Sequence, residues 1–189
     1  GLGTTAGATT VSSGAALSIS NNITVAEAIT ISGTGVSSGG ALVFTSGNNT
    51  YSGDITLAAS TPLIKSTAGQ QIISGTINGA QALTITTSDN LTLSGTIGAT
   101  APPTSLTVTT TGTGVLALNA NVTTSGAQSY TAAGNITINA DRTLTGSIIT
   151  TNSALSGAYA LTITGNAVFG DGTGTDTINL SGSGKNLSV

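Results

Sequence analysis

The sequence predicts an all-β, single-domain fold: a parallel β-helix, or β-solenoid, of about eight or nine coils with roughly 20 residues in each coil. Three observations predict it. Apolar and polar residues alternate, short strand patterns return about every twenty residues, and Gly, Ser and Asn fill the gaps between them. We expect residues 1–189 to form one continuous segment of this solenoid.

The spacing of the apolar residues distinguishes strands from helices. Ile, Leu and Val stand two residues apart in twelve pairs but three residues apart in a single pair, Val115 with Leu118. A helix needs apolar neighbours three and four residues apart, whereas a strand presents residues i and i+2 on one face. The pattern therefore predicts strands.

Thr is the central residue of eight of these pairs, which places an apolar face inward and a β-branched hydroxyl outward. In chain order these strands are expected at 23–25, 29–31, 55–57, 83–85, 91–93, 106–108, 136–138 and 161–163. Strands with another polar centre are expected at 17–19, 178–180 and 187–189. The residues expected in the core are Ile85, Leu93, Val108, Leu118, Ile138 and Ile163. Those expected outside are Thr84, Thr92, Thr107, Thr137 and Thr162.

Short repeats set the length of the coil. Residues 74–77 (Ser-Gly-Thr-Ile) return twenty positions later at 94–97, and 83–85 return after twenty-three residues at 106–108. The extra residues of the second repeat surround 101–103 (Ala-Pro-Pro), which suits a loop. Stacked coils explain this spacing, whereas an antiparallel sandwich of hairpins would show shorter and more regular turn spacing.

A longer echo relates residues 40–57 to residues 114–138. Residues 40–57 contain Gly-x-Leu-x-Phe followed by Asn-Thr-Tyr-Ser-Gly-x-Ile-Thr-Leu, and residues 114–138 are a looser copy with Gln-Ser-Tyr-Thr at 128–131. This motif resembles the strand repeat of bacterial autotransporter passengers and filamentous-haemagglutinin-like adhesins. The resemblance implies a right-handed β-helix that forms the stalk of a secreted or surface-attached bacterial protein, and it transfers no catalytic residue.

Composition excludes several classes of site. The chain has no His, Cys, Met or Trp, so imidazole and thiolate metal sites, Ser-His or Cys-His nucleophiles and disulfides are excluded. Three basic residues cannot form a nucleic-acid or anionic-membrane surface, and no apolar run is long enough for a membrane helix. Of the six acids, only Asp171 and Asp176 are near each other in sequence. We therefore expect no enzyme, no catalytic residue and no cofactor.

Two candidate sites stand out. Residues 170–178 resemble one copy of a calcium-binding β-roll nonapeptide, in which Asp171 and Asp176 would be ligands. Such sites lie between stacked copies, so a single copy is expected to hold no ion. Tyr51, Tyr130 and Tyr159 could be sugar-stacking platforms, although a sparse aromatic residue in a coil more often caps the core or packs beside a turn.

Two further patterns have ordinary explanations. Thr-x-Thr, which β-solenoid ice-binding proteins stack into hydroxyl ladders, occurs eight times among 38 threonines, as often as chance gives. The sequence therefore gives no reason to expect ice binding. Six Asn-x-Ser/Thr sequons indicate Asn at turns, with side chains stacked in amide ladders.

The expected function is a non-enzymatic structural segment, the stalk or fibre of an extracellular or cell-surface bacterial adhesin or filament. The chain contains no Met, opens on Gly-Leu-Gly without a polar cap and ends within a strand at 187–189, so we expect a piece of a longer chain. Its expected partners are adjacent coils of that chain or identical subunits stacked end to end. The alternative is a glycan- or surface-binding module.

Overall fold

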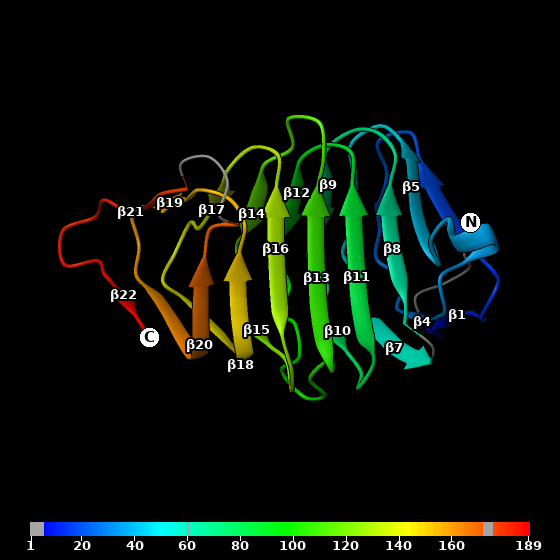
Figure 1. Ribbon diagram of the computed structural model, residues 1–189. Coiled ribbons are helices and arrows are strands. Elements are labelled where there is room, and N and C mark those ends of the chain that lie inside the picture. Colours follow the sequence, from blue (N-terminus) through cyan, green and yellow to red (C-terminus); the bar gives the residue numbers. More distant parts are fainter. Residues whose placement is uncertain (1–5, 60, 172–175) are drawn as a thin grey trace.

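The computed structural model describes residues 6–59, 61–171 and 176–189. Within these ranges the chain forms 22 β-strands and one short 3₁₀ turn, η1 (Val36–Ser38). All the paired strands run parallel. They stack along one axis, with the two ends of the chain at opposite ends of the stack (Figure 1). The predicted parallel β-solenoid is confirmed, with about eight turns roughly 22 residues apart.

The strands line three sides of a common interior. The first side begins with β1 (Thr9–Val11), β4 (Ile29–Ser32), β7 (Ile55–Ala59) and β10 (Ile77–Asn78). Isolated bridges from Ile77 to Ile97 and from Ile97 to Val122 continue this side. It is completed by β15 (Val122–Thr123), the first halves of β18 (Arg142–Thr151) and β20 (Leu161–Phe169), and β22 (Leu187–Ser188).

The second side faces the viewer in Figure 1, where its strands stand side by side. Its strands are β2 (Leu17–Ser20), β5 (Leu42–Ser46), β8 (Leu63–Ser66), β11 (Ala82–Thr87), β13 (Ser105–Thr110) and β16 (Gln128–Ala132). The second halves of β18 and β20 extend it. These two long strands turn the corner between Thr145 and Ile148, where the register shifts, so the first and second sides join there.

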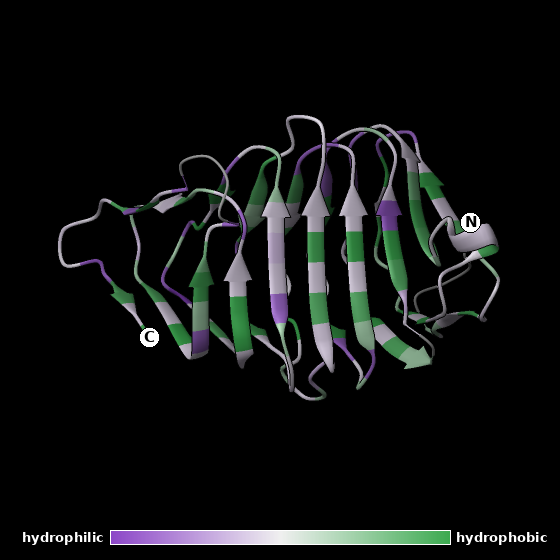
Figure 2. Ribbon diagram, in the orientation of Figure 1, coloured by the Kyte–Doolittle hydropathy of each residue, from purple (hydrophilic) through white to green (hydrophobic). Residues whose placement is uncertain are grey.

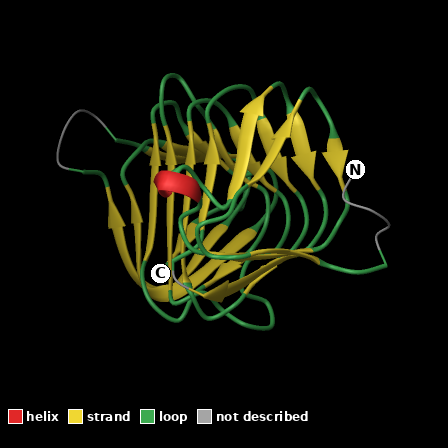
Figure 3. Ribbon diagram, turned by 90° about the vertical axis from the view of Figure 1, so that its right-hand side faces the viewer, coloured by secondary structure: helices red, strands yellow, loops and turns green. Residues whose placement is uncertain are grey.

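The third side is an eight-stranded sheet. Its strands are β3 (Thr24–Val25), β6 (Asn49–Tyr51), β9 (Gln71–Ile73), β12 (Leu91–Leu93), β14 (Leu116–Leu118), β17 (Ile136–Thr137), β19 (Leu155–Gly157) and β21 (Ile178–Leu180). Figure 3, viewed from the end that carries η1, shows strands on different sides of the shared interior. Each coil therefore passes through the three sides in turn.

The predicted alternation is confirmed in most strands, and Figure 2 shows it as green and pale bands along the strands. It is wrong near the two ends of the stack, where Ile23, Ile178 and Val189, expected inward, are exposed. The predicted core residues are all buried, namely Ile85, Leu93, Val108, Leu118, Ile138 and Ile163. Of the threonines predicted outside, Thr107 and Thr162 are exposed and the others are half-exposed. Columns of inward residues continue from coil to coil, because the strand register pairs apolar residues with apolar residues, as it pairs Ile85 with Val108.

The short sequence repeats also match the structure. Ile77 pairs with Ile97, and Leu83 pairs with Leu106, so each repeat is one coil. The coil from Ile97 to Val122 is longer because residues 98–104 form a loop.

The longer echo between residues 40–57 and 114–138 does not correspond to equivalent positions. Tyr51 lies in β6 on the third side, whereas Tyr130 lies in β16 on the second side. Residues 40–57 pass through three strands, β5, β6 and β7, whereas residues 114–138 pass through four, β14, β15, β16 and β17, so no single shift superimposes the two segments. All three sides use the same inward and outward alternation, so strands from different sides resemble one another in sequence.

Glycines stack at the corner between the third and first sides. A Cβ atom at Gly95 would overlap the carbonyl oxygen of Gly75, and one at Gly75 would overlap the carbonyl oxygen of Gly53. A Cβ atom at Gly53 would in turn overlap the carbonyl oxygen of Glu27. The coils approach one another so closely at this corner that only glycine fits.

Side-chain oxygens at the turns bind the next coil. They accept backbone N–H groups about one coil further along, so each turn is tied to its neighbour. These pairs are Asn48 to Gln70 (2.9 Å), Asp54 to Thr76 (2.9 Å), Asn78 to Thr100 (3.0 Å), Asn90 to Val115 (2.8 Å) and Asn121 to Thr143 (2.9 Å). The expected amide ladders are thus side chain-to-backbone contacts.

Substitution of Ile85 by Ala tests the inward column. We expect a loss of about 2–5 kcal/mol in the free energy of unfolding, because a cavity replaces a fully buried side chain. Thr84→Ala, one residue away and pointing outward, should lose less than about 1 kcal/mol. Urea unfolding followed by circular dichroism measures both variants, and equal losses would contradict the assigned faces.

Substitution of Gly95 by Ala tests the close corner. The added methyl group meets the backbone of the previous coil, so we expect destabilisation of about 1–3 kcal/mol or more. Gly7→Ala is the matched control, because a Cβ atom at Gly7 has open space within 4 Å. Thermal melting compares the two, and an unchanged melting temperature for Gly95→Ala would show that the coils are farther apart.

Candidate functional site

Two of the three tyrosines proposed as sugar platforms lie in the core, whereas Tyr159 is exposed. Tyr51 and Tyr130 are both 0% exposed. The Tyr51 hydroxyl donates to the carbonyl oxygen of Glu27 (2.6 Å), and the Tyr130 hydroxyl donates to Oε1 of Gln128 (2.8 Å). Burial raises the pKa of both phenols above the usual range, and the Glu27 charge raises the pKa of Tyr51 further. Neither of these two rings can stack on a sugar outside, because both are packed inside the core.

The calcium candidate lies in a loop of which the structure describes only the ends. Asp171 and Asp176 are exposed, and the backbone N–H of Asp171 donates to Oδ2 of Asp176 (3.3 Å). Residues 172–175 of the nonapeptide lie outside the described residues. In the described ranges, no three His, Cys, Asp or Glu residues come together in a way that could hold a metal ion. The absence of calcium from this loop stays a prediction.

Three other carboxylates each have their own local contacts. Asp54 Oδ1 accepts both the backbone N–H and the hydroxyl of Thr76, at 2.9 Å each. Asp89 Oδ1 accepts the N–H of Asn90 (2.8 Å). Glu27 is 6% exposed; its Oε1 accepts the Thr9 hydroxyl (3.3 Å), whereas its Oε2 has no hydrogen-bond partner among the described residues. These hydrogen bonds link no two of the three carboxylates to each other.

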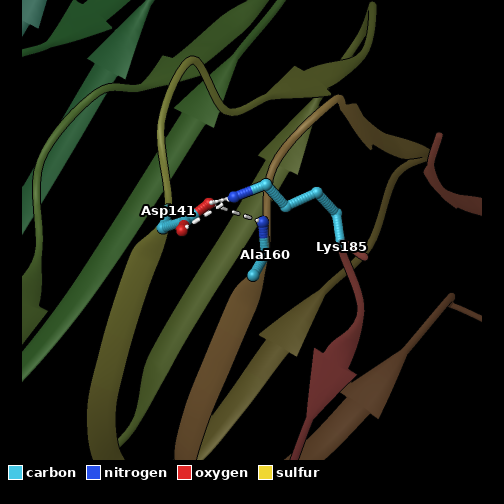
Figure 4. A network of polar contacts seen from close by, with 3 residues as sticks. All are labelled: Asp141, Ala160 and Lys185. Atoms are coloured by element: carbon cyan, nitrogen blue, oxygen red, sulfur yellow. Dashed lines mark hydrogen bonds and ion pairs between the residues drawn. The ribbon is translucent and has the colours of Figure 1, made fainter. Parts of the chain in front are cut away.

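Asp141 and Lys185 form an ion pair between residues distant in sequence (Figure 4). Lys185 Nζ lies 2.9 Å from Oδ1 and 3.0 Å from Oδ2 of Asp141, and the backbone N–H of Ala160 donates to Oδ1 (3.0 Å). The hydrogen bond from Lys185, and after it the one from Ala160, lower the pKa of Asp141. The pair joins the start of β18 to the segment before β22.

A surface of aligned hydroxyl groups covers the outer face of the second side. We call it the hydroxyl surface; it consists of Thr84, Thr86, Thr107, Thr109, Ser129, Thr131 and Thr150. The registers place these residues in two ladders across β11, β13, β16 and β18. All of them are exposed or half-exposed. Only two of the eight Thr-x-Thr motifs, 84–86 and 107–109, lie wholly within the hydroxyl surface. The number of such motifs in the sequence therefore could not predict this surface.

The hydroxyls of this surface are almost all unengaged. Within the described part of the chain, six of the seven make no hydrogen bond, and Thr131 Oγ1 accepts from Nδ2 of Asn152 (3.1 Å). Inward threonines behave differently: Thr87 Oγ1 donates to the carbonyl oxygen of Asp89 (2.8 Å) and Thr110 Oγ1 to that of Gly114 (2.6 Å). The outward groups are therefore available to molecules outside the chain.

Comparison with known proteins assigns no family to this chain. Family models, curated proteins and solved structures were searched, and none matches this chain. Among the described residues, no helix has the length and apolar character needed to cross a membrane.

Removal of the Asp141 carboxylate tests the ion pair. Because the folded-state pKa is lowered, the contact stabilises the fold at neutral pH and is lost as the pH falls through that lowered value. We expect Asp141→Asn to lower the melting temperature modestly at neutral pH and low salt, and the difference from the parent chain to vanish in acid. High salt should also shrink it, because both side chains are partly exposed.

Lys185→Gln is the matched variant for the same contact. It should give a similar decrease in melting temperature at neutral pH. The double variant should lose little more than either single variant, because both remove one interaction. A fully additive double variant would mean that the two side chains do not interact.

Proposed function

We propose that this chain is a non-enzymatic structural segment: a stretch of the stalk or fibre of a secreted or surface-attached bacterial adhesin or extracellular filament. One observation carries the proposal. Parallel backbone pairing continues from β1 to β22, and each paired strand has its partners in the adjacent coils. Such a stack extends in one direction by adding coils, which suits reach and rigidity.

The dimensions of the coil support this role. Each coil adds roughly 4.8 Å to the length of the stack, so the about eight turns span close to 40 Å. Every added coil brings hydrogen bonds and buried columns of the same kind. Length can therefore be increased without changing the cross-section.

The adhesin-like motif supports the proposed class of parent protein. Residues 40–57 contribute β5, β6 and most of β7, so the motif follows the chain once through the second, third and first sides. A repeat of this kind suits a stalk built from many coils. The proposed location is the extracellular space or the bacterial cell surface.

The proposed partners are adjacent coils of the same parent chain or identical subunits stacked end to end. In the described chain, the terminal strands of the three sides pair on one side only, for example β3 and β21 of the third side. An unpaired parallel edge is a template for a further strand. Because opposite ends of the stack differ, contacts between identical subunits would be head to tail and would generate filaments.

The alternative, a glycan- or surface-binding module, would require an outward aromatic cluster near Tyr51 or Tyr130, and both of these rings are buried. No aromatic pair replaces them on the second side, whose outward positions near the centre carry Thr and Ser.

Electron microscopy and light scattering of the purified chain test the structural role. We expect elongated particles of constant width that associate end to end as the protein concentration rises. Association should depend on concentration and leave the width unchanged, because only the ends interact. A monodisperse monomer at all concentrations, with both ends covered by its own chain, would defeat the stalk and the fibre alike.

A further inference from the structure

The hydroxyl surface repeats in two directions. One ladder contains Thr84, Thr107, Ser129 and Thr150, and the other contains Thr86, Thr109 and Thr131. Neighbouring rungs are roughly 4.8 Å apart and the two ladders roughly 6.6 Å apart, as the strand spacing and rise require. Backbone hydrogen bonds between the coils hold these spacings, so the array exists before any ligand arrives.

The side chains themselves are also ordered. Thr is stiff at χ1, so its hydroxyl and methyl groups occupy few positions. Each methyl group fills space between hydroxyls and limits how water can orient there. The surface therefore presents a regular lattice of donors and acceptors separated by small apolar groups.

The chemistry of the surface excludes several kinds of ligand. None of its seven residues is charged, and the nearest charge in register is Lys65, which pairs with Thr86 at the β8 edge. A charged ligand would find no counter-charge among the seven. Sugar rings commonly stack on aromatic faces, and Tyr130 points into the core beneath this surface. A matching ligand must itself be neutral, rigid and periodic, and must bind through oxygen.

The outward columns of the other two sides are shorter or interrupted. On the third side a single outward column passes through Thr50, Ile72, Thr92, Ala117 and Thr137. Ile72 and Ala117 interrupt its hydroxyls. The first side also has two ladders, of three rungs each: Thr143, Thr162 and Ser188, and Thr123, Thr145 and Thr164. The double ladder of the second side is the longer one, with four rungs in one ladder and three in the other.

We propose that the hydroxyl surface binds ice. Crystalline water is a neutral array of oxygens whose repeat within a layer is close to the separation of neighbouring strands. Its molecules are already ordered, so hydrogen bonds from the ladders require little further loss of water entropy. This activity goes beyond the structural role and does not depend on it.

The test measures ice recrystallisation and thermal hysteresis in solutions of the 189-residue chain. The chain should inhibit recrystallisation and shape growing ice crystals. The variant Thr107→Lys with Thr109→Lys should lose this inhibition, because it places two charges in the centre of the array. The matched control, Thr92→Lys with Thr137→Lys on the third side, should keep it. Circular dichroism melting establishes that all three proteins are folded.

A second variant is designed to gain activity, which unfolding cannot mimic. Leu63→Thr with Lys65→Thr adds one rung in register with Thr84 and Thr86 and removes the bordering charge. Inhibition of recrystallisation should persist at lower protein concentration than for the parent chain. A decrease or no change would count against the array as the binding surface.

Three results would overturn the proposal. One is a parent chain that leaves ice growth unchanged relative to the Thr107→Lys and Thr109→Lys variant. Another is an equal loss in the third-side control, which would assign any effect to the protein in general. The last is co-sedimentation of the chain with microcrystalline cellulose without any effect on ice, which would assign the surface to a polysaccharide instead.

Discussion

The whole structure depends on parallel, in-register pairing of each coil with the next. A strand of two to six residues buries little by itself, and most of its backbone groups find partners only in the neighbouring coils. Once the coils stack, inward residues at equivalent positions form continuous columns. The stacked glycines at the corner and the Asn and Asp contacts between turns are consequences of the same close approach.

The interior adapts to the corners by including polar side chains. Gln71 is fully buried, and its Nε2 donates to the carbonyl oxygens of Gly47, Ala68 and Gly69 at 3.0, 2.8 and 3.0 Å. Gln128 does the same at another corner, donating to Thr145 (2.8 Å) while accepting from Tyr130. Sharp turns direct carbonyl groups inward, away from solvent, where buried amides satisfy them.

Threonine serves two purposes in this chain according to the direction of its side chain. Inward hydroxyls such as those of Thr87 and Thr110 bind turn carbonyls and hold the corners. Outward hydroxyls leave the surface neutral and polar, and on the first and second sides they are aligned in register. One residue type thus supplies both the internal hydrogen bonds of a structural rod and the array that we propose as an ice-binding surface.

The sequence by itself determined the strands, the direction of their side chains and the approximate coil length. Alternation is a local property, so Ile85 and Thr84 could be assigned to opposite faces from their neighbours alone. Strands without a Thr-centred apolar pair, such as β8 and β16, lacked that signal. Only the tertiary structure decided which strands lie side by side, because this depends on the exact length of each coil and on where its corners fall. For this reason Tyr51 and Tyr130 lie on different sides of the coil, although their surroundings in the sequence are similar. For the same reason two of the eight Thr-x-Thr motifs form one surface together with Ser129, Thr131 and Thr150.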